Sequence, residues 1–362
     1  MHHHSHHQRT PVHRRGDQDV SVSSHESSTA APGQSEVAAV DAAEESGRRL
    51  SFRKQAFRRT LRAIVVAFWV MVVAFGLIRL APGDPVVAAL GADATPEAIA
   101  VLRADLGLNV DVFTQFFQYT TALIRGDLGQ SMFSGVSVTT MLSTNLPVTL
   151  WLIALTILLT VLLAIPLAMF VALVRWKWLP YAFRSITAVG LALPSFLVAL
   201  IFLLYFGIRL GVAPISGYDA QFPQNLGYLW LPALVNCVIL VPILSRVLYS
   251  SLSDTLEEEF VETGIIRGVN SFRFLWLYVL RPSLAPTIVL LSYMMGVMIG
   301  STVILEIIFS LPGIGRELVS AVSMRDYPVV QSIVLVFGVL VVILSLLGDL
   351  LATLLDPRVK MS

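Results

Sequence analysis

The stretch VTLWLIALTILLTVLLAIPLAMFVALV, residues 148–174, decides the fold class of this sequence. It contains no charged side chain, and it is longer than the roughly 20 residues that a helix needs to cross about 30 Å of hydrocarbon. A helix satisfies all the backbone hydrogen bonds of such a segment within lipid. The stretch therefore predicts a transmembrane helix, in which neighbouring helices tolerate a kink at Pro166.

Five further apolar stretches follow or precede this one, and the composition agrees with them. The chain has 362 residues, of which 56% are hydrophobic and 14% are charged, whereas soluble globular proteins carry about 25% charged residues. Pro194 and Pro242 also fall inside expected helices. The sequence therefore predicts an all-α integral membrane protein with six transmembrane helices, at about 63–80, 148–174, 186–209, 229–249, 287–309 and 329–355.

Lys and Arg residues are distributed unevenly between the connecting segments. A basic cluster lies at 48–62, and further cations lie between helices 2 and 3, between helices 4 and 5, and after helix 6. Cytoplasmic loops are enriched in Lys and Arg. We therefore expect a cell-membrane protein with both termini and segment 251–286 in the cytoplasm and segment 81–147 outside. The net charge of +1 gives no reason to expect nucleic-acid binding.

Composition also divides the chain into regions. Large apolar residues are scarce in residues 1–48, which predicts a disordered cytosolic tail. All seven histidines lie between His2 and His25, and three interpretations stay open for them: an expression tag, a native metal-binding tract or a solvated tail. The remaining regions are a basic segment with helix 1 (49–80), an external helical segment (81–147), a transmembrane core with helices 2–6 (148–356) and a cytosolic end (357–362).

Several kinds of chemistry are missing from the membrane region of the sequence. Without histidine after His25, it has no HExxH zinc motif and no Ser-His-Asp triad. It also has no GxxxxGK[ST] phosphate loop, so any ATP must be bound by another chain. Cys237 lies in an apolar run and is interpreted as a small buried hydrophobic residue. We expect no metal site and no catalytic residue in this chain.

The external segment carries two helix signals and a turn. Thr95 as N-cap, followed by Pro96 and Glu97, predicts one helix, and the amphipathic pattern predicts a second from Asp111 to about Arg125. The turn formed by Pro82, Gly83, Asp84 and Pro85 is interpreted as a rigid helix stop, because its two prolines fix the chain direction. Four acidic residues suit either a solvated surface or a docking face: Asp84, Asp105, Asp111 and Asp127.

A charged insert, FVETGIIRGV (260–269), interrupts the apolar pattern between helices 4 and 5. Its apolar and small residues follow helical spacing, while its charged residues lie largely elsewhere on the helical wheel. Gly in a helix interior costs about 1 kcal/mol relative to Ala, so Gly264 and Gly268 require a reason. Two interpretations fit equally: an amphipathic helix on the membrane surface, or a helix that docks closely against a partner protein.

The insert resembles the EAA loop of ABC importer permeases, which reads Glu-Ala-Ala, three residues, then Gly. Here Glu262-Thr263-Gly264 is followed by Gly268, with Gly replacing the second Ala. Other stretches, in the same order and spacing as in the family, extend the resemblance from about residue 55 to the end of the chain. They are IRLAPGDPV (78–86), LRADLGLN (102–109), IRGDLGQSMFSGVSV (124–138), EIIFSLPGIGRELVSAVSMRDYPVVQ (306–331) and LLDPRVK (354–360). Together they look like the first permease subunit of dipeptide, oligopeptide and nickel ABC importers.

This resemblance implies a type I ABC importer permease fold with six transmembrane helices. It implies a second permease subunit, two cytosolic ATPase subunits that bind ATP and Mg²⁺, and an extracytoplasmic binding protein that delivers cargo. Glu262, Thr263, Gly264 and Gly268 would form the coupling contact with an ATPase. Arg267 and Arg273 could pair with acidic groups there, which is our inference rather than a family rule. Peptides are the commonest cargo of such permeases, and nickel chelates, opines and oligosaccharides are the alternatives.

One ionisable residue lies within an expected transmembrane helix near its outer end. Such a residue is a candidate functional site, and for Glu306 two roles stay open: a gate or cargo contact, or hydrogen bonding to the amides of the following turn. That turn contains Pro312, Gly313 and Gly315, and its glycines suit a tight or re-entrant path. An intramembrane enzyme would need a second acid, base or metal ligand at the same depth. A secondary transporter would predict an internal repeat, which we do not find.

Overall fold

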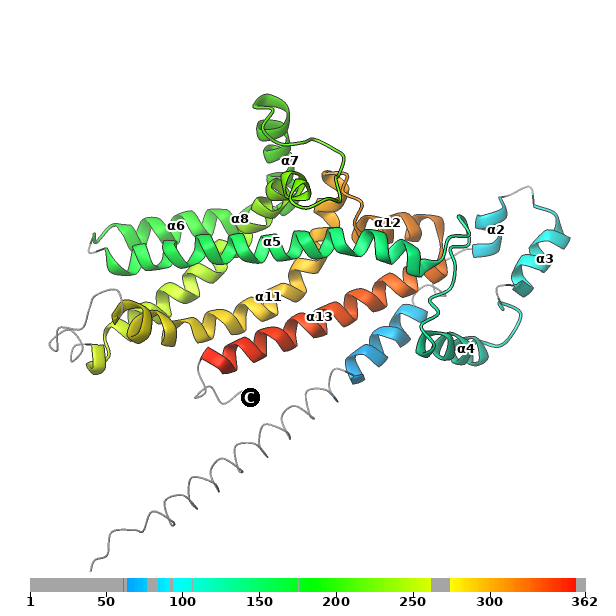
Figure 1. The fold of residues 1–362 in the computed structure, drawn as a ribbon, viewed down its shortest axis with the longest axis horizontal. Helices are drawn as coiled ribbons and strands as arrows, with labels where there is room; N and C mark the ends of the chain where they lie inside the picture. The colour runs from blue at the N-terminus through cyan, green and yellow to red at the C-terminus, as the bar shows by residue number, and fades with distance from the viewer. Residues whose placement is uncertain are drawn as a thin grey trace, which may run out of the picture. The chain divides into compact units, whose positions relative to one another are not determined.

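A computed structural model of the chain describes residue 61 and residues 64–76, 84–91, 94–105, 107–174, 176–261 and 274–355. All of them belong to one unit, Arg58–Ser362. This part of the chain is helical, and the pairing of Gln130 with Ser137 is the one isolated β-bridge in it. The predicted all-α fold is therefore confirmed for the described residues (Figure 1).

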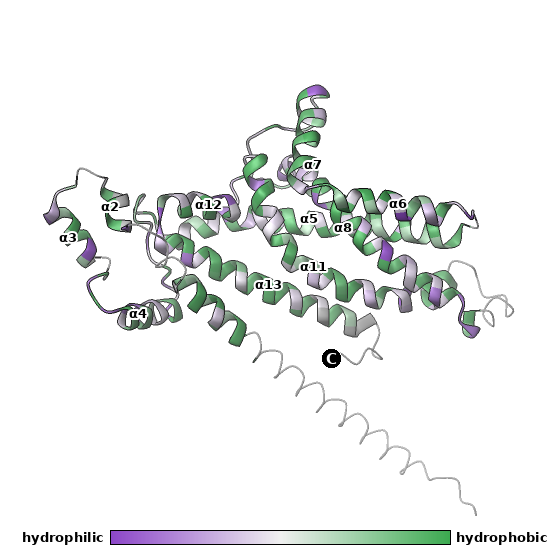
Figure 2. Ribbon diagram, turned by 180° about the vertical axis from the view of Figure 1, so that it is seen from behind, coloured by the Kyte–Doolittle hydropathy of each residue, from purple (hydrophilic) through white to green (hydrophobic). Residues whose placement is uncertain are grey.

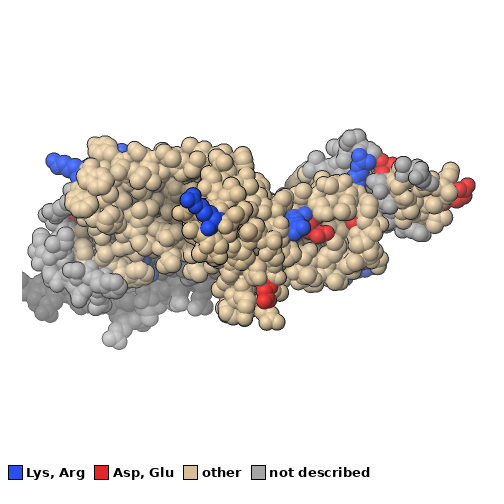
Figure 3. Space-filling model, turned by 90° about the horizontal axis from the view of Figure 1, so that it is seen from above, with Lys and Arg blue, Asp and Glu red and all other residues tan. Residues whose placement is uncertain are grey.

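Four helices are long and apolar enough to cross a membrane. They are α5 (Val138–Leu173), α8 (Gln224–Leu256), α11 (Arg281–Ile308) with the preceding π-helix η2 (Leu275–Leu280), and α13 (Tyr327–Leu355). α5 packs along α8, and α11 packs between α8 and α13. Figure 2 shows hydrophobic residues along most of their length, and Figure 3 shows few charged side chains over much of the face seen from above.

The third apolar stretch differs from the single helix that we expected at 186–209. It consists of α6 (Leu179–Ala192), α7 (Ser195–Phe202) and the π-helix η1 (Leu203–Arg209), and the chain bends by 93° between α6 and α7. Leu193 is extended and Pro194 precedes α7. Since proline has no N–H and disfavours a helical residue before it, Pro194 ends α6 rather than kinking one continuous helix. Pro166 and Pro242, by contrast, lie inside α5 and α8 as predicted.

The remaining apolar stretch is shorter in the described chain. It forms a helix over Ile64–Gly76, and positions 77–80 of the expected span lie outside the described residues. α5 also begins at Val138, before its apolar stretch starts at 148. The amino-terminal region expected to be disordered, residues 1–48, likewise lies outside the described residues.

Three short helices precede α5, and two of them were predicted. α3 spans Pro96–Asp105, and the Thr95 hydroxyl accepts a hydrogen bond from the Ala98 amide at 3.3 Å. α4 spans Val112–Ile124 and is capped by Asp111, whose carboxylate accepts from the Thr114 amide at 3.0 Å. α2 (Pro85–Leu90) was not predicted. A further helix, α12 (Ile314–Met324), connects α11 to α13.

Candidate functional site

Glu306 is fully buried near the end of α11, with 0% of its surface exposed. The Thr149 hydroxyl of α5 donates to its Oε1 at 2.6 Å, and the Arg316 amide of α12 donates to its Oε2 at 3.0 Å. The Thr149 hydroxyl in turn accepts from the Ile314 amide at 3.1 Å. We call these four residues the Glu306 anchor. It joins three helices through one carboxylate and satisfies two amides of the first turn of α12.

Two glycines make room for this carboxylate. A Cβ atom at Gly313 would overlap the carboxylate of Glu306, and a Cβ at Gly315 would lie 2.8 Å from both its Oε2 and the backbone of Val303. Gly313 has an ordinary φ of −96°, so the close approach, and not a left-handed conformation, requires glycine there. Pro312 is exposed beside them.

The geometry of Glu306 shows which atoms it contacts. Both carboxylate oxygens accept hydrogen bonds within the protein, and the carboxylate lies at the amino-terminal end of α12, where the helix dipole favours negative charge. The expected bond to turn amides is thus present. A role for Glu306 as a gate or cargo contact stays a prediction.

A second polar connection lies at the junction of α12 and α13. Asp326 is almost fully buried there, and it accepts from the Ser131 hydroxyl at 2.5 Å and from the Met132 amide at 3.2 Å. The Ser332 hydroxyl donates to the Leu128 carbonyl at 3.3 Å. These bonds fasten the loop before α5 to the start of α13. Neither Asp326 nor Ser131 was predicted as a site residue, although both lie in stretches that carry the resemblance.

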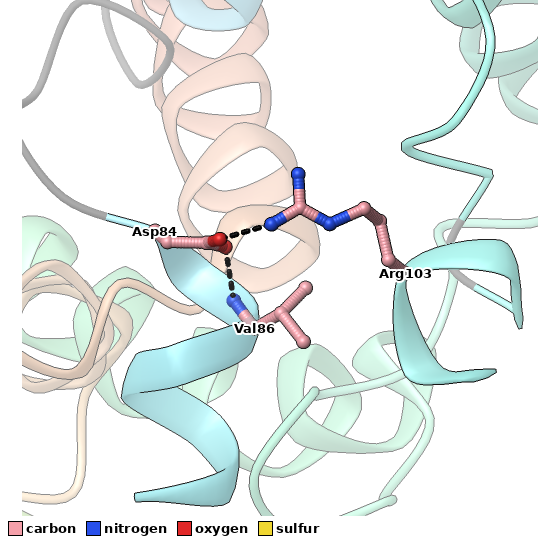
Figure 4. Close-up of polar contacts among 3 residues, drawn as sticks. All are labelled: Asp84, Val86 and Arg103. Carbon is pink, nitrogen blue, oxygen red and sulfur yellow. Dashed lines mark hydrogen bonds and ion pairs between the residues drawn. The ribbon is translucent and has the colours of Figure 1, made fainter. Parts of the chain in front are cut away.

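Asp84 connects two of the short helices that precede α5. Its carboxylate accepts from the Val86 amide at 3.0 Å, which caps α2, and it forms an ion pair with Arg103 of α3 (Figure 4). Pro85 is the first residue of α2. The turn interpreted as a helix stop therefore also starts a helix. Pro82 and Gly83 lie outside the described residues.

The candidate coupling residues also lie outside the described residues, namely Glu262, Thr263, Gly264, Arg267, Gly268 and Arg273. The chain on both sides of them is described. Val261, only 2% exposed, packs in one apolar core with Leu252 of α8, Leu280 of η2 and Ala168 of α5. We call this core, together with Ser283 and Thr255, the loop frame.

A polar bond reinforces the loop frame. The Ser283 hydroxyl of α11 donates to the Thr255 hydroxyl of α8 at 2.9 Å. The described residues on both sides of segment 262–273, Val261 and Phe274, thus belong to the same core, which is shared by α5, α8, η2 and the start of α11.

Comparison with known proteins identifies the family. Residues 164–361 match the family described as binding-protein-dependent transport system inner membrane component, and residues 52–156 match the amino-terminal region of the membrane component of such systems. The chain belongs to this permease family. It is therefore a multi-pass membrane component of a binding-protein-dependent transport system, which disfavours the membrane-enzyme alternative.

Individual relatives cover most of the permease. It is 32% identical over 307 residues to a probable peptide ABC transporter permease of Sinorhizobium fredii, across 84% of this chain and 98% of the relative. It is 32% identical over 306 residues to a putative peptide transport system permease of Brucella abortus, with the same coverage of 84% and 98%. It is 31% identical over 303 residues to a glutathione transport system permease of Pectobacterium atrosepticum, across 84% of this chain and 97% of the relative.

Proposed function

We propose that this permease is one of two membrane subunits of an ATP-driven importer that carries peptides delivered by an extracytoplasmic binding protein. The support for peptides comes from relatives named as peptide permeases and from relatives named for glutathione, which is itself a short peptide. Nickel chelates, opines and oligosaccharides are the alternative cargoes. ATP and Mg²⁺ would bind to separate ATPase subunits.

The proposed topology has six spans with both termini in the cytoplasm. In chain order, the first span is the helix Ile64–Gly76 with its continuation, the second is α5, and the third is the bent pair formed by α6 with α7 and η1. The fourth span is α8, the fifth is η2 with α11, and the sixth is α13. α6 has 14 residues, about 21 Å at 1.5 Å per residue, so it cannot cross about 30 Å of hydrocarbon alone. The bent pair would have to complete this span together, while segment 81–147 would lie outside.

The loop frame is the observation that carries the proposed coupling. The described residues on both sides of segment 262–273 belong to one buried core, so an ATPase that grips the segment would act on that core and on the helices that share it. Glu262, Thr263, Gly264 and Gly268 would contact the ATPase, and Arg267 and Arg273 would face acidic groups on it. Charge keeps such a segment out of lipid, and glycine permits close backbone approach.

Cysteine labelling tests the topology. The single native cysteine is buried, so Cys237→Ser removes the background, and Gln115→Cys and Asn270→Cys report on the two sides. In intact cells an impermeant thiol reagent should label position 115, with position 270 reacting only after the membrane is opened. The reverse pattern would show that the orientation is inverted.

Reconstitution tests the function. The two permeases and two ATPases are placed in proteoliposomes with the binding protein outside, and uptake of a labelled tripeptide is followed with and without ATP. The proposal expects uptake that needs both ATP and binding protein. Uptake without either would indicate a secondary transporter. Native mass spectrometry of the loaded binding protein distinguishes peptides from the alternative cargoes.

A further inference from the structure

A cavity of about 410 Å³ lies among the helix Ile64–Gly76, α4, the loop before α5 and the start of α13. Its volume falls within the range of about 300–1,000 Å³ that is common for small-ligand sites. Figure 1 shows the beginning of α13 directed toward α4. The cavity is distinct from the Glu306 anchor and from the loop frame, and neither the family nor the named relatives assign it a role.

Two polar side chains from different helices line this cavity, and one of them is buried without a hydrogen-bond partner among the described residues. The Tyr119 hydroxyl of α4 is buried and unpartnered. Gln331 of α13 is 5% exposed and lines the same cavity. Most buried polar groups in proteins are hydrogen-bonded. An unsatisfied hydroxyl on one helix and a nearly buried carboxamide on another, both lining one cavity, indicate that a ligand supplies the missing partner.

The cavity wall selects the kind of ligand. No Lys or Arg occurs among the described residues that line it, and three carboxamide side chains do, from Gln115, Gln118 and Gln331. The described part of the wall thus has no cationic side chain to neutralise a phosphate or carboxylate. Burial raises the pKa of Tyr119 to about 12, so its hydroxyl keeps its proton at neutral pH. The wall therefore suits ligand groups that donate and accept hydrogen bonds and carry no negative charge.

One negative charge lies on the wall. Asp127 is exposed and lines the cavity, and its Oδ1 accepts from the Gly129 amide at 2.9 Å. The second carboxylate oxygen can accept from a cation. A peptide combines these features, because each residue carries one amide donor and one carbonyl acceptor, and its amino terminus carries a positive charge.

We propose that this cavity binds the amino-terminal end of a transported peptide, with Tyr119 and Gln331 bonding its backbone and Asp127 facing its ammonium group. The proposal rests on the peptide-import function proposed above and adds a contact site on the permease itself. A segment of the binding protein has the same backbone chemistry. A segment within the binding-protein chain has no free amino terminus. The contribution of a free amino terminus to binding therefore distinguishes a transported peptide from such a segment.

The test measures peptide binding to the purified permease–ATPase complex in nanodiscs, without binding protein or ATP. A tripeptide labelled at its carboxyl end is the probe, and its N-acetylated form is the comparison. Tyr119→Phe removes only a hydroxyl group and should weaken binding of the tripeptide about fivefold, as expected for one neutral hydrogen bond. Gln331→Met should have a similar effect. Tyr181→Phe is the matched control, because Tyr181 is exposed on α6 away from the cavity, and it should bind like wild type.

Acetylation tests the charge contact separately. Acetylation of the tripeptide's amino terminus should weaken its binding to the wild-type complex. It should not weaken its binding to the Asp127→Asn complex any further. Equal binding by wild type, Tyr119→Phe and Gln331→Met would overturn the proposal, as would an acetylation effect that Asp127→Asn leaves unchanged. Variants that lose affinity only for the binding protein would assign the cavity to that protein and also overturn it. Failure of wild-type ATP-driven peptide uptake would instead contradict the proposed function.

Discussion

The Glu306 anchor and the loop frame hold two parts of the bundle by different means. The anchor is polar and fully buried: one carboxylate bonds α5 and α12 from α11, and glycines at 313 and 315 let it approach. The loop frame is mainly apolar, with the bond between Ser283 and Thr255 added to it. The anchor fixes a turn within the protein. The frame holds the chain on both sides of segment 262–273, which itself lies outside the described residues.

Removal of the anchor carboxylate should have the largest effect. Glu306→Ala leaves the Thr149 hydroxyl and the Arg316 amide buried without their acceptor, and we expect a loss of about 3 kcal/mol or more in stability. Glu306→Gln keeps the shape and one acceptor oxygen, so it should lose less. Thermal unfolding in detergent measures both. As a control, Glu258→Ala removes an exposed carboxylate near segment 262–273. An unchanged melting temperature for Glu306→Ala would show that the anchor does not hold α12.

A smaller change tests the fit around the carboxylate. Gly313→Ala should cost about 1–3 kcal/mol, as overpacking of a filled site does, because its methyl group overlaps Glu306. Gly300→Ala is the matched control: it lies in the same helix as Glu306 and has open space around it. Since alanine favours helix by about 1 kcal/mol over glycine, the control should be neutral or stabilising. If both variants behaved alike, the close approach to Glu306 would be refuted.

The smallest predicted effect is a pH-dependent change in stability caused by Glu317 of α12. Burial, together with the nearby charge of Asp326, raises the pKa of Glu317 above its ordinary value. A carboxyl whose pKa is higher in the folded state destabilises the fold when it is ionised, and this cost disappears as pH falls below the ordinary value. Glu317→Gln should therefore raise the melting temperature slightly at neutral pH, within about 0.5 kcal/mol. The difference should vanish near pH 4, about the ordinary carboxyl value. A gain that is equal at both pH values would contradict this assignment.

Local sequence signals predicted the short helices and their caps, because Thr95 and Asp111 act on amides only a few residues away. The long apolar helices followed from composition and length. The break at Pro194 was not predicted, because proline inside an apolar stretch is compatible with either a kink or a sharp bend. In the folded chain α6 and α7 both pack against α8 on either side of this bend.

The partners of Glu306 show more clearly that a sequence does not reveal contacts between residues far apart in the chain. An ionisable residue in an apolar stretch is conspicuous in a sequence, so Glu306 and its glycines could be singled out. Thr149 could not, since it is 157 positions away and one hydroxyl in an apolar helix carries no signal of its partner. The cavity between α4 and α13 was missed for the same reason, because Tyr119 and Gln331 meet only in the folded chain.

Recovery of ATPase subunits with Gly268→Arg tests the central claim, that the middle of segment 262–273 contacts an ATPase. An unpaired buried charge at that contact should cost several kcal/mol, about 3–5, and lower docking affinity by orders of magnitude. The matched control is Gly227→Arg, which places the same side chain in open space on α8. We predict normal membrane levels for both variants and loss of co-purifying ATPase for Gly268→Arg alone. If Gly268→Arg and Glu262→Lys both retained ATPase recovery and uptake at wild-type levels, the coupling role would be contradicted.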